Sequence, residues 1–301
     1  MRRRHPVAPG DVAIVRALAA DAEAVDGHPP LGDAVWRDLQ APSGGTTLFL
    51  AVDGDEPIGA LHATASVDGA VTAAIVVHPE HRAAGVARAL LDAATAALPA
   101  RGARHVTLWA FGADGRADAF ATAAGFAPVR ELWQMRVGLP LTEAPKWPTG
   151  ITVRPFVPGA DEAEWVGLNN RAFAHDPDQG GWTTDQLHHL ESEPWFDPAG
   201  FLVALNERGL AGSCWTKVHP PAPPHEPEAL GEIYVIGVDP DRQGSGLGRA
   251  LVVGGLASLH ARGTNVGMLF VDATNTAAIE LYRSLGFEVT RVDRAYGREV
   301  A

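Results

Sequence analysis

The chain has 301 residues and 46% hydrophobic content, which is enough to bury a large core and favours two domains over one. Its formal net charge of −12 and the lack of any basic stripe argue against a nucleic-acid partner. No apolar run approaches the ~18 residues of a membrane helix, and the single cysteine, Cys214, excludes an internal disulfide, so we expect a cytoplasmic protein without a membrane partner.

The first half alternates helical and strand-like patterns. After Met1 to Arg4, a basic stretch expected to be a solvated N-terminus, the hydrophobic periodicity predicts two helices, a hairpin, a strand, a long helix, a strand, a helix and a closing strand. Their expected ranges are 11–25, 34–39, 46–52 with 58–66, 71–77, a helix ending at Leu98, 106–111, a helix ending at 124–126, and 131–137.

The same order returns in the second half. Three landmark pairs, Pro79/Pro240, Gly85/Gly246 and Gly125/Gly286, are each separated by 161 residues, which indicates an internal duplication. Proline and glycine punctuate 141–150 as a linker. We therefore predict domains at 1–140 and 151–301, each with mixed α/β (α+β) structure.

A glycine-rich turn follows the apolar run Ile233 to Val238 and opens a helix near Leu247. Such a turn brings backbone N–H groups and a helix N-terminus close to an anion, so it suits a phosphate, although a plain tight turn is the alternative. The turn is not a Walker loop, because no Gly-Lys-Ser/Thr follows, and it lacks the third glycine of the dinucleotide fingerprint.

This turn, Q-G-S-G-L-G-R at Gln243 to Arg249, resembles the pyrophosphate loop of the GNAT superfamily of N-acetyltransferases. The later N-T-A-A-I-E-L-Y-R-S-L-G-F at Asn275 to Phe287 resembles that superfamily's second acetyl-CoA motif. The resemblance implies two tandem GNAT domains, each a twisted, mostly antiparallel mixed sheet flanked by helices and splayed where pantetheine inserts. It also implies acetyl-CoA as co-substrate.

Three groups of the second half suit acetyl transfer to an amine. Glu232, at the start of the strand before the turn, can take the ammonium proton, and Tyr282 can protonate the departing thiolate. The Val238 N–H is placed to stabilise the thioester oxygen. Subtracting 161 from Glu232 and Tyr282 leads to Val71 and Ala121, so the first half lacks both ionisable groups. We expect direct attack in a ternary complex, catalysed by the C-terminal domain.

The segments at 169–183 and 214–220, the strand before the glycine turn and the C-terminal L-Y-R-S-L-G-F closely resemble the mycothiol synthase family. That family acetylates the cysteinyl amine of the cysteine–glucosamine–inositol conjugate, the last step of mycothiol biosynthesis. The resemblance places acceptor-binding residues at Asp33, Asp178, Lys217, Glu232 and Phe270. Asp33 and Asp178 stand where glutamate is expected and Phe270 where tyrosine is expected, which puts details of acceptor recognition in doubt.

The resemblance also assigns acetyl-CoA contacts to both halves. The positions are Ile236, Gly237, Val238, Gln243, Gly244, Ser245, Gly246, Leu247, Gly248, Arg249, Asn275, Thr276, Ala277, Ala278, Ile279 and Glu280, with Ile75, Val76, Val77, Arg82, Gly85 and Arg88 in the first half. The first half can be a second acetyl-CoA site or a structural relic, and both readings stay open.

The superfamily serves many acceptors, so the fold does not decide among them. The alternatives are an N-acetyltransferase for another small amine or a peptide N-terminus, and a non-catalytic CoA-binding module. The histidines lack metal-ligand spacing, and we expect no metal. We expect a monomer.

Overall fold

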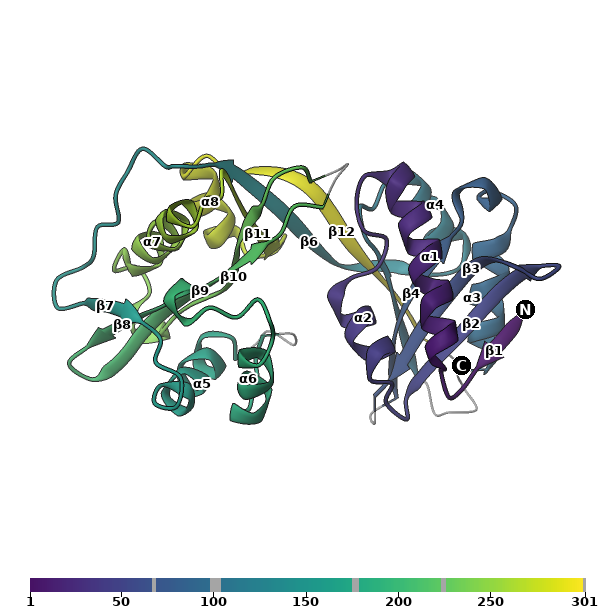
Figure 1. The fold of residues 1–301 in the computed structure, drawn as a ribbon, viewed down its shortest axis with the longest axis horizontal. Coiled ribbons are helices and arrows are strands. Elements are labelled where there is room, and N and C mark those ends of the chain that lie inside the picture. The colour runs from purple at the N-terminus through teal and green to yellow at the C-terminus, as the bar shows by residue number, and fades with distance from the viewer. Residues whose placement is uncertain (67–68, 98–103, 175–178, 223–225, 300–301) are drawn as a thin grey trace. The chain divides into compact units, whose positions relative to one another are not determined.

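The computed structural model describes residues 1–66, 69–97, 104–174, 179–222 and 226–299 (Figure 1). Contacts divide the chain into two compact units. Unit 1 comprises Met1–Trp133, Asp272–Thr274 and Arg291–Ala301, and unit 2 comprises Gln134–Val271 and Asn275–Thr290. Each unit is a mixed sheet flanked by helices, as the sequence predicts.

Unit 1 is built on strands in the order β1-β2-β3-β4-β5-β12. Neighbouring strands are antiparallel except for β4 and β5, which are parallel. The bounds are β1 Arg2–Arg4, β2 Thr46–Asp53, β3 Glu56–Ala65, β4 Ala70–Val77, β5 His105–Ala110 and β12 Glu288–Glu299. Arg2 and Arg3 are exposed, as expected of a solvated N-terminus, but Arg2 to Arg4 also pair with Leu50 to Leu48 as an edge strand that the sequence did not predict.

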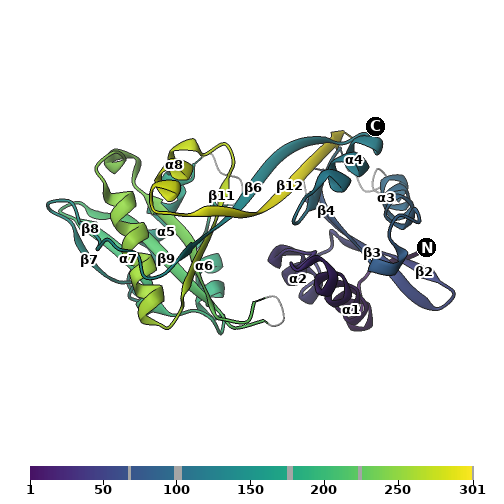
Figure 2. The same cartoon turned by 90° about the horizontal axis from the view of Figure 1, so that it is seen from above.

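Helices cover both faces of this sheet (Figure 2). α1 (Pro9–Asp26) and α2 (Asp33–Gln40) pack on one face, where Leu18, Leu39, Leu48, Ala74 and Val76 form a buried cluster. α3 (Val86–Ala97) and α4 (Gly115–Ala123) pack on the other face against Val71 and Ala73. Alternate residues of β4 therefore serve two separate cores, which is the period-two pattern of a strand buried on both sides.

Unit 2 repeats this plan with strands in the order β6-β11-β10-β9-β8-β7. Here β10 and β11 are the parallel pair, and β10-β9-β8-β7 are antiparallel. The strands are β6 Ala127–Gly138, β7 Thr152–Pro155, β8 Phe201–Asn206, β9 Gly209–His219, β10 Leu230–Val238 and β11 Val266–Asp272, and the helices are α5 Glu162–Ala172, α6 Thr184–Glu191, α7 Leu247–Ala261 and α8 Thr276–Ser284. Figure 1 shows α5 and α6 on one side of β9 and β10, with α7 and α8 on the other.

The compact units are not contiguous in the chain, whereas the domains expected from the sequence are. β6 and β12 each contribute residues to both units, and the end of β12 from Arg294 to Glu299 pairs with β5 of unit 1. The C-terminal residues thereby complete the sheet of the N-terminal half. None of the helices within the described ranges is long and apolar enough to cross a membrane.

The predicted duplication is present in the backbone. α4 at 115–123 and α8 at 276–284 have identical lengths, and their bounds differ by 161 residues. The turns before α3 and α7 also match, with φ of 81° at Gly85 and 85° at Gly246. The two halves can therefore be compared residue by residue.

Candidate active site

A β-bulge in β10 distinguishes unit 2 from unit 1. The pairing of β10 with β9 is regular from Val238↔Gly212 to Val235↔Trp215 and then skips to Ile233↔Thr216 and Glu232↔Lys217, so Tyr234 is the extra residue. In unit 1, β4 and β3 pair without interruption from Val77↔Gly59 to Val71↔Ala65. Because side chains alternate with a period of two, one extra residue turns every earlier side chain of β10 to the other face.

The bulge determines which face Glu232 occupies. Glu232 lies directly opposite Lys217, two residues after Trp215, and Trp215 packs in the core under α5 and α6. Val71, its counterpart by chain count, belongs instead to the core under α3 and α4. Directly opposed residues of antiparallel strands share a face. Glu232 therefore lies on the α5/α6 face, together with Lys217.

Phe270 lies on this face as well. Met268 is the register partner of Glu232 on β11, and Phe270 follows two residues later with 38% of its surface exposed. Lys217 extends across two aromatic rings, with its Nζ atom 4.7 Å from the centroid of Trp195 and 5.6 Å from that of Tyr234. The structure thus brings together three of the five predicted acceptor-binding residues, Lys217, Glu232 and Phe270.

The other two predicted acceptor residues are placed differently. Asp33 is the exposed first residue of α2 in unit 1. Asp178 lies outside the described residues. Their proposed roles remain predictions that rest on the family resemblance.

His219 is a site residue that the sequence reasoning missed. Its Nε2 atom lies 2.6 Å from Oε2 of Glu232, whose residue is 8% exposed. His219 is the last residue of β9 and pairs with Leu230, so it is a diagonal neighbour of Glu232 on the same face. The alternation of Trp215, Lys217 and His219 along β9 indicates that the three side chains share a face. Because the bulge in β10 cannot be read from the sequence, the β10 residue that faces His219 could not be predicted.

The strand after the bulge has one open edge, as the predicted splaying requires. β10 and β11 pair only from Leu230↔Val266 to Ile233↔Leu269, although β10 continues to Val238. Asp239 N–H donates to Ala211 O on the β9 side. Successive N–H groups of a strand point to opposite edges, so Val238 N–H points to the open edge.

Unit 1 has an equivalent open edge. β4 pairs with β5 from Ala70 to Ala74 and continues unpaired on that side to Val77. The predicted acetyl-CoA positions Ile75 to Val77 and Ile236 to Val238 are therefore the open segments of the two strands. Unpaired backbone groups are available to an extended chain that bears amides, such as pantetheine.

The glycine turn of unit 2 has the geometry of an anion site. Gly244 and Gly246 adopt φ of 74° and 85°, and a Cβ added to either would meet no atom within 4 Å. α7 begins at Leu247. The Ala250 N–H donates to the carbonyl of Gly246, the residue just before the helix. The N–H groups of the first turn are therefore left for another acceptor.

Unit 1 keeps this turn without its first glycine. Ala83, the counterpart of Gly244, has φ of 60° and is the only non-glycine residue of the described chain in the left-handed region. A left-handed alanine costs about 1–2 kcal/mol relative to the right-handed conformation. The turn has retained its shape despite this strain.

Several predicted acetyl-CoA residues also have structural partners. Asn275 caps α8 by accepting from Ala278 N–H at 3.2 Å, as Asp114 caps α4 by accepting from Ala117 N–H at 3.1 Å. Arg82 forms a two-pronged ion pair with Asp26 at 2.6 and 2.7 Å, and this contact raises the pKa of Arg82. These side chains therefore have structural roles at the turns and helix starts.

The other two arginines among the predicted acetyl-CoA residues, Arg249 and Arg88, are also ion-paired. Arg249 bonds Glu143 and Ser284, and Arg88 bonds Asp92 and the Ala123 carbonyl.

Tyr282 is buried on the opposite side of the β10 sheet from Glu232, in α8, and its ring packs against Phe287. Burial raises the pKa of Tyr282, and the nearby Cys214 thiol adds to the increase. Burial also raises the pKa of Cys214 to about 12. Both groups are therefore protonated at neutral pH. Tyr282 can donate a proton, whereas Cys214 is a packing residue beneath α7, as its apolar setting suggests.

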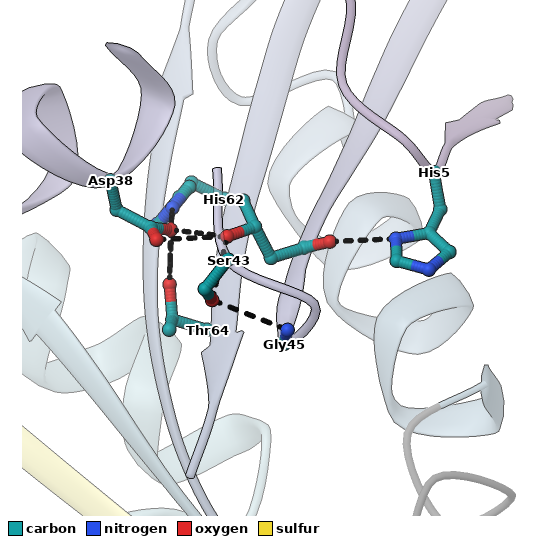
Figure 3. A network of polar contacts seen from close by, with 7 residues as sticks. His5, Asp38, Ser43, Gly45, His62 and Thr64 are labelled. Carbon is teal, nitrogen blue, oxygen red and sulfur yellow. Dashed lines mark hydrogen bonds and ion pairs between the residues drawn. The ribbon is translucent and has the colours of Figure 1, made fainter. Parts of the chain in front are cut away.

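The face of unit 1 that corresponds to the Glu232 face of unit 2 carries a network of hydrogen bonds centred on Asp38 (Figure 3). By register, His62 and Thr64 correspond to Trp215 and Lys217. Asp38 of α2 accepts hydrogen bonds from His62 Nε2 at 2.6 Å, Thr64 Oγ1 at 2.5 Å and Thr46 Oγ1 at 2.8 Å. Burial lowers the pKa of His62, although Asp38 opposes the shift.

The pKa of Asp38 itself responds to two opposing effects. Burial alone would raise the pKa of Asp38, but the bonds from Thr64, Thr46 and His62 outweigh it and lower that pKa. The network ties α2 to the sheet.

One group in unit 2 carries metal-type ligands. Glu162, His188 and Glu191 have ligand atoms within 4.8 Å of one another, between α5 and α6. Burial, and then the negative charge of Glu162, raise the pKa of Glu191.

Comparison with known proteins agrees with this architecture. The model of the acetyltransferase (GNAT) family matches residues 13–126 and 168–287. Among solved structures, a GCN5-related N-acetyltransferase from Sphaerobacter thermophilus is 26% identical with a TM-score of 0.75, covering 99% of this chain and 95% of that one. A tandem GNAT protein of the clavulanic acid pathway shares the fold at 18% identity and a TM-score of 0.76, covering 100% of this chain and 98% of that one.

Curated relatives are more similar in sequence. A mycothiol acetyltransferase of Cellulomonas flavigena is 45% identical over 94% of this chain and 84% of its own length. One of Thermobispora bispora is 44% identical over 96% and 97%, and one of Streptomyces avermitilis is 43% identical over 97% and 93%. The chain therefore belongs to the acetyltransferase (GNAT) family, as a tandem-domain acetyltransferase of the mycothiol acetyltransferase group.

Proposed function

We propose that the protein transfers an acetyl group from acetyl-CoA to the cysteinyl amine of the cysteine–glucosamine–inositol conjugate, completing mycothiol biosynthesis. The relatives named mycothiol acetyltransferase support the substrate class. The observation that carries the chemistry is the bulge at Tyr234, which places Glu232 on the face that bears Lys217 and Phe270. The protein would act as a monomer in the cytoplasm, without a metal.

Glu232 is the proposed general base. Its carboxylate is 8% exposed and lies on the strand that leads to the glycine turn. A carboxylate in this position can accept a proton from the acceptor ammonium, directly or through one water molecule. The resulting neutral amine attacks the thioester carbonyl, and Lys217 and Phe270 supply a hydrogen-bond donor and an apolar surface for the acceptor.

Val238 and Tyr282 complete the proposed apparatus. The Val238 N–H on the open edge of β10 is the donor to the thioester oxygen, whose negative charge grows as the amine attacks. Tyr282, kept protonated by burial, gives its proton to the departing thiolate. The amine attacks directly, so no acetylated side chain is formed.

The glycine turn and α7 hold the acetyl-CoA phosphates in this proposal. Open space at Gly244 and Gly246 and the N-terminus of α7 fit a pyrophosphate. The contacts assigned to Gln243 to Arg249 and Asn275 to Glu280 are proposals of the same kind. Unit 1 offers a second acetyl-CoA site, because its turn keeps the same backbone conformation and its β4 edge is open at Ile75 to Val77.

The test is acceptor selectivity. CoA release from acetyl-CoA is measured with the conjugate, with simple amines and with peptide N-termini as acceptors. A rate that requires the conjugate supports the proposal. A faster rate with another amine identifies an N-acetyltransferase of different specificity, and binding of acetyl-CoA without release of CoA for any acceptor identifies a non-catalytic CoA-binding protein.

A further inference from the structure

His219 is the direct polar neighbour of the proposed base. Its Nε2 atom lies 2.6 Å from Glu232 Oε2, with 32% of the His219 side chain and 10% of the Glu232 side chain exposed. An ionised carboxylate only accepts hydrogen bonds, so this contact requires a proton on Nε2. A contact of this length to a mostly buried carboxylate belongs to the strong class of hydrogen bonds.

The fold builds this contact from two features. His219 terminates β9, opposite Leu230, while Glu232 follows two residues later on β10. The bulge at Tyr234 then turns Glu232 toward the face of His219. In unit 1 the corresponding register position of Glu232 is Thr72, and the residue two after Thr64, just past the end of β3, is Ser66, so both members of the pair are replaced.

The hydrogen bond from His219 gives the two oxygens of the Glu232 carboxylate different roles. Oε2 accepts from His219, and no side chain among the described residues bonds to Oε1, which is therefore the oxygen that can take the acceptor proton. A carboxylate held at one oxygen loses rotamer freedom, which keeps the other oxygen in one place during attack. Lys217, directly opposite, is held over the rings of Trp195 and Tyr234.

We propose that His219 is a positioning residue that acts through Glu232 by donating its Nε2–H to Oε2, so that Oε1 is presented as the base. This inference rests on the proposed function. One proton passes from the acceptor ammonium to Oε1, giving a neutral amine and a carboxylic acid, while the Nε2–H bond to Oε2 persists. His219 itself transfers no proton.

The test uses graded replacements. His219→Gln keeps an amide donor at the reach of Nε2, His219→Asn shortens that reach, and His219→Ala removes the donor. We expect His219→Ala and His219→Asn to lower kcat about 10- to 100-fold, as a displaced catalytic group does, with the KM for acetyl-CoA unchanged. His219→Gln should recover kcat to within about threefold of wild type. His189→Ala, an exposed histidine of α6, is the matched control and should have the wild-type rate.

Two further measurements separate this inference from the proposed function. In a Glu232→Gln background, His219→Ala should cause no additional loss of kcat, because its effect passes through Glu232. The ¹⁵N spectrum of histidine-labelled protein should show His219 protonated at Nε2, with a changed signal in Glu232→Gln, whether or not the conjugate is acetylated.

A wild-type kcat in His219→Ala would overturn the proposal. So would an equal loss in the Glu232→Gln background, failure of a folded His219→Gln to recover activity, or a His219 signal that Glu232→Gln leaves unchanged. If wild type does not acetylate the conjugate, the proposed function fails, and the spectrum alone decides whether the pair exists.

Discussion

Glu232 and Val71 are separated by 161 residues at matching places in the two halves, yet their side chains lie on opposite faces of their sheets. One inserted residue, Tyr234, accounts for the difference. Val71 packs into an apolar core under α3 and α4, whereas Glu232 joins Lys217 and His219 on the α5/α6 face. The duplicated fold thus obtains a carboxylate-bearing face through a change of register as well as a change of residue.

Tyr282→Phe tests the proposed acid. The hydroxyl of Tyr282 makes no hydrogen bond with the part of the chain that the structure describes, so its removal should change the free energy of unfolding by less than about 0.5 kcal/mol. Loss of the proton donor should lower kcat about 10²- to 10⁴-fold. Steady-state kinetics and urea unfolding measure the two effects.

Tyr296→Phe is the matched control for that experiment. Tyr296 is also buried, but its hydroxyl donates to Asp118 at 2.7 Å in unit 1. This variant should lose stability and keep kcat. Equal kcat losses in the two variants would contradict the assignment of Tyr282.

Ala83→Gly tests the strain in the turn of unit 1. Glycine adopts the φ of 60° at this position without the clash that Cβ causes, so the free energy of unfolding should rise by about 1 kcal/mol. The neighbouring Ala84→Gly, whose φ is not positive, should instead lose stability through backbone entropy. Urea denaturation of both variants compares them, and a destabilised Ala83→Gly would show that the turn is unstrained.

The stoichiometry of acetyl-CoA tests the second site. If both turns hold phosphate, isothermal titration should find two molecules of acetyl-CoA per chain. Gly85→Val and Gly246→Val each place a β-branched residue at φ above 80°, so each should remove one of the two. A stoichiometry of one that Gly85→Val leaves unchanged would identify unit 1 as a structural relic.

The network around His62 predicts a loss of stability in mild acid. The pKa of His62 is lowered in the fold, so below about pH 6.5 the unfolded chain binds more protons than the folded one. The melting temperature should therefore fall as pH decreases from 7 toward 5, and the lowered pKa of Asp38 adds a further loss at still lower pH.

His62→Gln removes the titrating group, and calorimetry should find a flatter dependence of melting temperature on pH over that range. His189→Gln, at an exposed position, should behave like wild type. Identical pH dependence in wild type and His62→Gln would show that the network does not carry the effect.

Much of this architecture could be predicted from the sequence, because hydrophobic alternation, the glycine turns and the 161-residue offset are local or periodic signals. The open strand edges at Ile75 to Val77 and Ile236 to Val238 followed from the family resemblance, and the strand pairing agrees. The bulge could not be predicted, because Tyr234 continues an apolar strand without any turn residue. The contact of His219 with Glu232 depends on that bulge and was missed for the same reason.

The pairing partner of the end of β12 could not be predicted from the sequence either. Its pairing with β5 joins residues separated by almost two hundred positions, and no local pattern specifies that partner. The resulting units are discontinuous in the chain.

The proposed mechanism depends above all on removal of the acceptor proton by Glu232. The most direct test compares wild type with Glu232→Gln in CoA release from acetyl-CoA with the cysteine–glucosamine–inositol conjugate. The exposed Glu288→Gln at the start of β12 serves as the matched carboxylate control. Glu232→Gln should bind acetyl-CoA normally and react about 10²- to 10⁴-fold more slowly, while Glu288→Gln should match wild type. A Glu232→Gln rate close to that of wild type would contradict this mechanism.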